Sequence, residues 1–323
     1  MARSSDDFPP ISDYAFLSDC QSLALVARDG SIDWAAVHRF DGRPVVARLL
    51  DREIGGFFQV APTAPETEIE RRYLPGTNVL ETTFTTPTGV VMLTDVMPVE
   101  PDPDEVGKAH RLGARHSLIR IVRGVSGSVE VGLTFRPRFE YGLTTPYITE
   151  LASDLVVAAG SADALLLESE IGPLPRDGPG GVDAHEVITA GDERVISITW
   201  STPSGLETSR IDHEEAVAEL DLTVRFWQRW TEQTRYDGPY REAVERSALA
   251  IKGLTVGKTG AVIAAATTSL PETIGGGRNW DYRYPWVRDS TTMLVALIRL
   301  GHDYECRRFS RWIRQTTAGR ASE

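Results

Sequence analysis

The sequence predicts an antiparallel β-sandwich followed by α-helices, and three observations support this prediction. The first two thirds of the chain hold many short apolar segments separated by turn sequences, a pattern typical of an antiparallel sandwich. After residues 202–205 the apolar spacing changes to three or four residues, which is the period of a helix. The chain of 323 residues also exceeds the usual size of a single core, so we expect more than one domain.

The strand predictions depend on alternating polarity and on turn residues. Residues 79–84 and 90–96 flank a Thr-Pro-Thr-Gly turn. Asp29-Gly30, a strong hairpin signal, separates two further apolar segments. We also predict a hairpin of residues 118–122 and 129–135, with Ser-Gly at 126–127 as its turn. The remaining strand candidates are mostly apolar: 23–27, 32–34, 155–159, 164–168 and 195–200.

Two segments have the composition of loops. Residues 100–105 are acidic and interrupted by prolines, and residues 172–181 hold four glycines and three prolines. The acidic run could bind a cation, but the alternating prolines disrupt ligand geometry. We therefore favour a solvated loop and predict no metal site.

Four helices are predicted in the last third of the chain. The first covers residues 214–232, and Pro239 opens the second. The third runs over residues 288–300 and ends at Gly301. Asp303 is expected to cap the fourth, whose apolar side is Cys306, Phe309 and Ile313. The predicted divisions are a β-sandwich domain at 1–205, a linker helix at 206–237 and a helical domain at 238–323.

Composition narrows the functional classes. The net charge of −12 argues against a nucleic-acid-binding face. The sequence has no apolar span of about 20 residues, and its N-terminus lacks the apolar core of a signal peptide. We therefore expect a cytoplasmic protein without a membrane partner. Cys20 and Cys306 are far apart, and we predict two buried free thiols, with a disulfide or metal site as the alternative. Nothing in the sequence requires a cofactor.

The densest group of functional residue types lies at 276–290, where four aromatic rings accompany three arginines and two aspartates. Flat rings beside charged pairs suit a sugar, which offers a C–H face for stacking and hydroxyls for hydrogen bonds. Tyr282, Tyr284 and Trp286 alternate along an extended segment, so we expect their side chains to point the same way.

Paired charges complete this segment. Arg288 and Asp289 fall at the start of the third helix, where the helix dipole favours the carboxylate. Adjacent opposite charges can hold two neighbouring hydroxyls. On these grounds alone, an ion-paired loop that merely closes a core is an equally good interpretation. The preceding Gly-Gly-Gly matches no phosphate-binding spacing.

Longer motifs resemble a known family. Asn-Trp-Asp-Tyr-Arg-Tyr-Pro-Trp-Val-Arg-Asp-Ser (279–290), with Ala-Ala-Ala-Thr-Thr-Ser-Leu-Pro-Glu upstream (264–272), resembles the signature of glycoside hydrolase family 15, the glucoamylase and bacterial trehalase group. Residues 11–20 and 29–34 resemble the opening of its bacterial members, and residues 73–82 resemble their N-terminal β-sandwich. The resemblance covers nearly the whole chain.

This resemblance implies a supersandwich domain followed by an (α/α)6 barrel, of which this chain would hold only the first helices. By position, Arg288 and Asp289 would hold hydroxyls of a terminal glucose. Tyr282 would lie near the sugar and the attacking water, and Trp286 would line the pocket. Structural support is expected from the remaining motif residues, Trp280, Asp281 and Tyr284.

The family inverts configuration with two glutamates, a general acid and a general base. Neither glutamate motif occurs in this sequence, so we expect no catalytic residue within it and both glutamates beyond residue 323. The first hypothesis is therefore an α-glucoside hydrolase cut short and inactive alone, with trehalose favoured over maltooligosaccharides. It predicts an unpartnered apolar row at Leu294, Leu297 and Ile298. Two others stay open: half of a split enzyme that needs a complementing second chain, and a non-catalytic carbohydrate-binding or interaction module. Exposed helix faces could also support a homo-oligomer.

Overall fold

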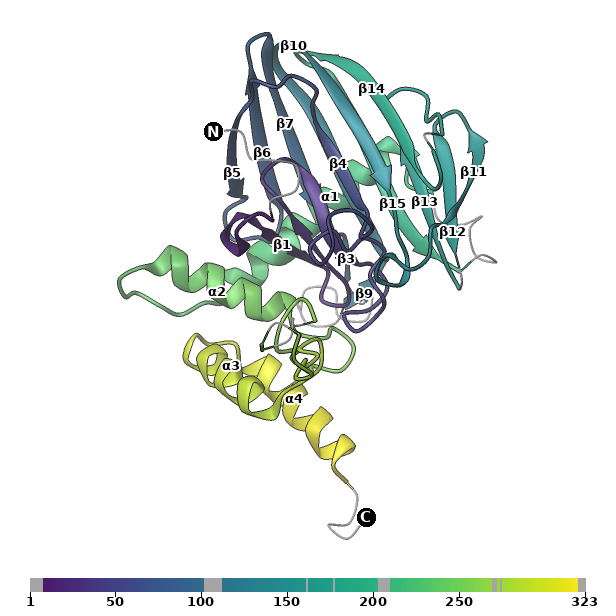
Figure 1. Ribbon diagram of the computed structural model, residues 1–323. Coiled ribbons are helices and arrows are strands. Elements are labelled where there is room, and N and C mark those ends of the chain that lie inside the picture. Colours follow the sequence, from purple (N-terminus) through teal and green to yellow (C-terminus); the bar gives the residue numbers. More distant parts are fainter. Residues whose placement is uncertain are drawn as a thin grey trace.

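One long strand organises the N-terminal part of the protein. In the computed structural model, which describes residues 8–101, 112–160, 162–176, 178–202, 210–268, 272–273 and 275–318, strand β10 (Ser117–Arg136) belongs to two sets of strands. Its first half pairs with β7 and β15, and its second half with β4 and β14. Figure 1 shows β10 as the shared element of the strand layers.

Every strand pair among the described residues is antiparallel, as predicted. The set around the second half of β10 contains β1 (Ala15–Ser18), β2 (Leu23–Val26), β3 (Ser31–Ala36), β4 (Phe57–Pro62) and β14 (Val182–Thr189). The set around its first half contains β5 (Glu68–Tyr73), β6 (Leu80–Thr86), β7 (Gly89–Val96), β11 (Tyr147–Ala152), β12 (Leu155–Gly160), β13 (Asp163–Ser169) and β15 (Glu193–Ser201).

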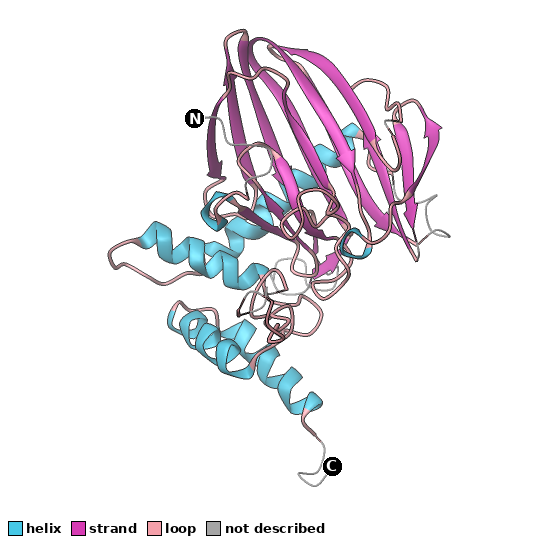
Figure 2. Ribbon diagram, in the orientation of Figure 1, coloured by secondary structure: helices cyan, strands magenta, loops and turns pink. Residues whose placement is uncertain are grey.

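The two sets share one apolar core. Phe58 and Leu133 from one set lie in the same cluster as Phe84, Leu93 and Leu165 from the other. Alternation along each strand explains this packing, because every second side chain points to the same face. The prediction of a β-sandwich followed by helices is thus confirmed (Figure 2).

One predicted hairpin is wrong. Residues 118–122 and 129–135 are not two strands joined by a turn but two parts of β10. The Ser-Gly at 126–127 lies just after a shift in the pairing with β7, and Gly127 pairs with Gly89. A β-bulge uses the same residue types as a turn, so local composition alone could not separate the two. The predicted hairpins at β2–β3 and β6–β7 are confirmed.

Four helices follow among the described residues: α1 (His213–Thr231), α2 (Arg241–Gly253), α3 (Val287–Arg299) and α4 (Asp303–Thr316). Gly301 ends the third with φ of 93°, as predicted. The predicted cap of the fourth is wrong, because Asp303 is its first helical residue and the N-cap position is taken by His302. None of the described helices is long and apolar enough to cross a membrane.

The helices pack on the sandwich and on one another. Helix α1 lies on the outer face of β10 and β15, where Ile119 and Val195 contact it. Leu297 of α3 is fully buried with the tryptophans of α1, and Leu294 packs beside Phe309 of α4. The expected unpartnered row is therefore wrong for Leu294 and Leu297. Ile298 is exposed, as expected.

Several smaller predictions can also be compared. Cys20 and Cys306 are free thiols, Cys20 fully buried and Cys306 partly buried. Glu100 and Pro101 belong to a short strand, β8 (Val99–Pro101), which pairs with β9 (Leu112–Ala114). The rest of the predicted acidic loop lies outside the described residues. The domain boundaries at 205 and 237 stay predictions.

Candidate sugar-binding site

The aromatic and charged segment lies between α2 and α3. It runs beside residues 264–265, whose amides donate to the carbonyls of Tyr284 and Tyr282 at 3.2 and 2.8 Å. The chain then enters α3, where the buried Ser290 hydroxyl donates to the Val262 carbonyl at 3.2 Å. These backbone contacts fix the segment at the beginning of the helix.

Three rings of this segment form a cluster. Tyr282 stacks on Trp286 with ring centroids 5.1 Å apart and an interplanar angle of 22°. Trp280 meets Trp286 edge-on at 6.4 Å. Tyr284 is about half exposed, and no ring contact to it is found in the described part of the chain. The structure therefore brings Tyr282, Trp286 and Trp280 together but leaves Tyr284 outside the cluster.

Arg288 and Asp289 lie in the first turn of α3, as the sequence predicts. Their side chains approach to 3.2 Å, and Arg288 remains 77% exposed whereas Asp289 is 31% exposed. An exposed guanidinium beside a half-buried carboxylate leaves both groups able to bind polar atoms from solvent. The positive end of the helix dipole also favours the Asp289 carboxylate at this position.

Arg283 anchors the segment to the β-sandwich. Its buried side chain binds Asp281 through Nε and Nη2, donates to the Gly42 carbonyl at 2.7 Å, and donates to the Tyr141 hydroxyl at 2.7 Å. Although burial alone would raise the pKa of Asp281, hydrogen bonds from Arg283 lower it. Asp281 is therefore held as a carboxylate inside an anchoring contact.

Sequence reasoning missed Tyr141 and Gly42. They lie 142 and 241 residues before Arg283, so no local spacing connects them. One unusual feature is that Tyr141 adopts a left-handed backbone conformation with φ of 62°, which a bulky residue rarely does. That strain is visible only in coordinates, so the sequence held no signal for this contact.

The two described glutamates from residue 272 onward, Glu272 and Glu305, contact other protein side chains. Glu305 is buried in α4, where one carboxylate oxygen accepts from Trp230 Nε1 at 2.8 Å and from Lys252 Nζ at 3.0 Å. Burial would raise its pKa, but the Lys252 ammonium and these hydrogen bonds lower it. Glu272 is exposed, accepts from Trp280 Nε1 at 3.3 Å and lies 3.9 Å from Arg278.

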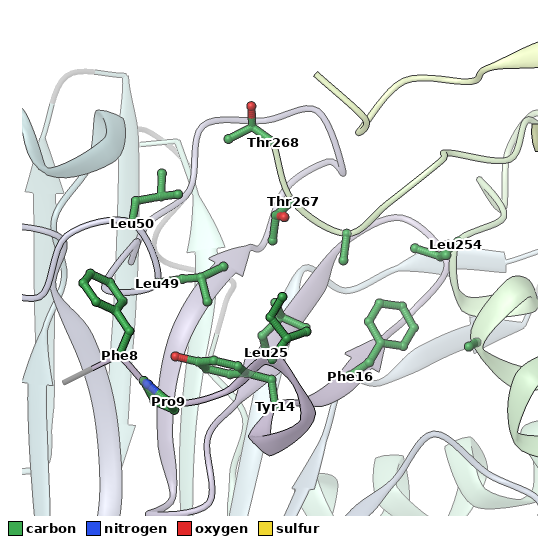
Figure 3. A pocket seen from close by; sticks show the side chains of 13 residues that line it. Phe8, Pro9, Tyr14, Phe16, Leu25, Leu49, Leu50, Leu254, Thr267 and Thr268 are labelled. Carbon is green, nitrogen blue, oxygen red and sulfur yellow. The ribbon is translucent and has the colours of Figure 1, made fainter. Parts of the chain in front are cut away.

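A separate apolar cavity of about 830 Å³ lies between the sandwich and α2 (Figure 3). Tyr14 and Leu25 line it from the strand side, Leu254 from the end of α2, and Thr267 and Thr268 from the segment that follows. Its lining does not include the aromatic cluster or Arg288 and Asp289. The residues expected to bind a sugar therefore lie outside this cavity.

No group of three or more histidine, cysteine, aspartate or glutamate side chains suited to a metal ion occurs in the described ranges. The aromatic cluster and the Arg288–Asp289 pair thus form the candidate site. Such a site can stack on a ring and exchange hydrogen bonds with hydroxyls.

Comparison with known proteins gives two matching family models. Residues 4–172 match the trehalase-like N-terminal domain, and residues 238–323 match glycosyl hydrolases family 15. The chain is 38% identical to a trehalase of Mycolicibacterium smegmatis over 98% of its own length and 48% of that protein. It is 30% identical to a trehalase of Thermoplasma volcanium, with coverages of 94% and 47%.

The chain spans about half the length of these curated relatives. Among solved structures, a putative kojibiose phosphorylase from human microbiome is similar with a TM-score of 0.40 and 8% identity, covering 80% of this chain and 42% of that one.

Proposed function

Since this chain belongs to glycosyl hydrolase family 15 and carries the trehalase-like N-terminal domain, we propose that it forms the glucose-holding part of an inverting, exo-acting α-glucoside hydrolase. The observation that carries this proposal is the stacked Tyr282–Trp286 pair on the segment that leads into the Arg288–Asp289 pair of α3. A ring face beside two opposite charges suits a sugar at its non-reducing end.

Each residue has a proposed task. Arg288 and Asp289 hold neighbouring hydroxyls of the terminal glucose, since the exposed guanidinium donates and the carboxylate accepts. Trp286 lines the pocket, and Tyr282 lies near the sugar and the attacking water. Asp281 acts indirectly, because its carboxylate binds Arg283 rather than facing solvent.

Supporting contacts come from Trp280 and Tyr284. Trp280 packs edge-on against Trp286, so it can fix the orientation of that ring. The carbonyl of Tyr284 accepts from Ala264, which holds the segment in its extended course. We assign both residues a supporting task, without direct contact to the sugar.

Bond cleavage by inversion needs a general acid and a general base about 6.5–9.5 Å apart. Glu305 cannot serve, because its carboxylate is buried and bound to Lys252 and Trp230. Glu272 matches no catalytic motif of the family. We therefore propose that the residues of this chain bind the sugar without cleaving it, and that hydrolysis requires two glutamates not included among them.

Trehalose is the proposed substrate, ahead of maltooligosaccharides. The support for this choice is that the relatives above are named as trehalases. Both sugars present the same terminal α-glucose, so the residues proposed here would bind either one.

Titration calorimetry on the full chain tests the binding part of this proposal. Trehalose and glucose should bind to the natural chain, and Arg288→Ala or Asp289→Ala should weaken binding at least about tenfold because each change leaves a charge without its partner. Arg299→Ala, at the opposite end of α3, is the matched control and should bind normally.

The cleavage part has its own readout. Glucose release from trehalose should be undetectable with the chain alone. If the chain did release glucose and Arg288→Ala abolished that release, the proposal that these residues bind the sugar without cleaving it would be wrong. In an enzyme containing the whole barrel, either substitution should lower kcat/KM at least about 100-fold. Unchanged sugar binding in both variants would disprove the assignment of these two residues.

A further inference from the structure

A second pair of opposite charges precedes the aromatic cluster. Arg278 and Glu272 approach to 3.9 Å, and their side chains remain 80% and 55% exposed. Arg288 and Asp289, which approach to 3.2 Å, follow the cluster at the start of α3. Along the chain, one arginine–carboxylate pair therefore lies on each side of the cluster.

Backbone contacts fix the position of Glu272. Its amide donates to the Arg278 carbonyl at 3.0 Å. Earlier in the chain, the amides of residues 264–265 donate to the carbonyls of Tyr284 and Tyr282. These contacts run in antiparallel order, so Glu272 lies beside the beginning of the segment that carries the aromatic cluster.

The indole of Trp280 connects this pair to the cluster. Trp280 Nε1 donates to one carboxylate oxygen of Glu272 at 3.3 Å, and the same ring meets Trp286 edge-on at 6.4 Å. The other oxygen of Glu272 lies 3.9 Å from Arg278 Nη1, which is too far for a hydrogen bond. Both charged groups can therefore exchange hydrogen bonds with a ligand.

Tighter pairs on the sandwich differ from this one. Arg72 and Arg123 hold glutamates at 2.7 and 2.5 Å, so these guanidinium groups already donate to a carboxylate. An exposed pair at 3.9 Å contributes little to stability. The wide spacing of Arg278 and Glu272 instead leaves donors and acceptors available beside the cluster.

We propose that Glu272 and Arg278 hold the second glucose unit of trehalose. This inference rests on the proposed function, in which Arg288 and Asp289 hold the first unit. Trehalose consists of two identical glucose units joined through their anomeric carbons, so both units present the same hydroxyls. Two pairs of the same kind, each an arginine with a carboxylate, match two such units.

The second pair gives the chain a means of selecting its substrate. In maltose the second unit is attached through the oxygen at carbon 4 and ends in a free anomeric hydroxyl, so its hydroxyls face in other directions. Arg288 and Asp289 then accept the terminal unit of either sugar, whereas Glu272 and Arg278 favour trehalose. The second pair determines specificity and takes no part in bond cleavage.

Calorimetric titration of the full chain with trehalose, maltose and glucose tests the proposal. Trehalose should bind at least about tenfold more tightly than glucose, and maltose should bind about as weakly as glucose. Glu272→Gln and Arg278→Ala should each weaken trehalose binding at least about fivefold but keep the glucose affinity within about twofold. Arg241→Ala, which removes an exposed pair with Glu245 on α2, is the matched control and should bind all three sugars normally.

Glucose binding separates this proposal from the proposed function. If the natural chain binds glucose but both variants bind trehalose normally, the assignment of Glu272 and Arg278 is wrong and the glucose site stands. Equal losses for glucose and trehalose in Glu272→Gln would also overturn it, because the glutamate would then only support the aromatic cluster. If the natural chain binds neither sugar, the proposed function is wrong and this inference fails with it. Circular dichroism of each variant confirms that the comparison is made on folded protein.

Discussion

The β-sandwich and the helical region each contain a buried ion pair, but the two pairs are satisfied differently. In the sandwich, Arg120 binds both oxygens of Asp95 at 2.8 and 3.3 Å and donates to the carbonyls of Phe58 and Gly30 at 3.1 and 2.7 Å. In the helical region, Lys252 lies 3.0 Å from one oxygen of Glu305, which also accepts from Trp230.

Because their hydrogen bonds differ, the two ion pairs stabilise their regions in different ways. Backbone ladders already fix the sandwich strands, and Arg120 adds hydrogen bonds across its layers. The helices have no such ladder between them, so the pair between α2 and α4 helps to set their orientation. Removing one member of a fully hydrogen-bonded buried pair lowers stability more, because the remaining member keeps an uncompensated buried charge.

The largest expected effect comes from Arg120→Met. The substitution leaves the fully buried Asp95 carboxylate without its partner, and we expect the free energy of unfolding to fall by about 3–5 kcal/mol. Urea unfolding followed by circular dichroism measures this loss. Arg123→Met removes an exposed pair with Glu193 and should change stability by less than about 1 kcal/mol. Similar losses in both variants would refute the contrast.

Lys252→Met should have the next largest effect, a loss of about 2–3 kcal/mol in the free energy of unfolding. Glu305 keeps its hydrogen bond from Trp230, which limits the penalty. Adding Glu305→Gln should restore part of the loss, since the double change removes the uncompensated charge. If the double variant is less stable than Lys252→Met in urea unfolding, the proposed cause is wrong.

Tyr141→Phe tests the contact between the two regions. It removes the hydroxyl that accepts from Arg283 and should cost about 1 kcal/mol. Because Arg283 lies within the segment that carries Trp280 and Trp286, the near-ultraviolet circular dichroism should change as well. Tyr147→Phe, at a largely exposed tyrosine, serves as the control. An unchanged spectrum in Tyr141→Phe would contradict a positioning effect of the sandwich on the site.

The smallest effect concerns pH. Burial lowers the pKa of His116 to about 4, and His38 adds to the shift. The unfolded chain takes up this proton near pH 6.5 and the folded chain only near pH 4, so protonation favours unfolding between these values. Stability should therefore fall as the pH drops from 6.5 to 4, by about 1 kcal/mol or less for this partly exposed ring.

His116→Asn checks this pH effect, because asparagine tolerates the left-handed backbone found at this residue. The difference in melting temperature between pH 6.5 and pH 4 should shrink in this variant. His185→Asn, at an exposed histidine, should retain the full difference. Parallel pH profiles for His116→Asn and the natural chain would rule out the assignment.

Local patterns predicted the helices well. The apolar spacing placed α1 and α3 within one residue of their observed bounds, because the 3.6-residue period and a stop at Gly301 are properties of neighbouring residues. The same local reasoning identified the segment that contains the candidate site residues Tyr282, Trp286, Arg288 and Asp289. These features needed no information from distant parts of the chain.

Distant contacts account for what the sequence did not reveal. The bulge in β10 depends on the pairing of Gly127 with Gly89, and the anchor of Arg283 depends on Tyr141 and Gly42. Neither contact leaves a pattern in local spacing. The buried Leu297 is a further case, because its partners in α1 could not be identified before the helices were packed.

The shared strand β10 also has a consequence for how the chain folds. Its partners range from β4, which begins at Phe57, to β15, which ends at Ser201. The set around the second half of β10 is complete only with β14, which ends at Thr189, and the other set only with β15, so the whole sandwich can close only after Ser201 has left the ribosome. Contacts this distant in sequence make folding slow, and one strand common to both sets favours a single cooperative transition.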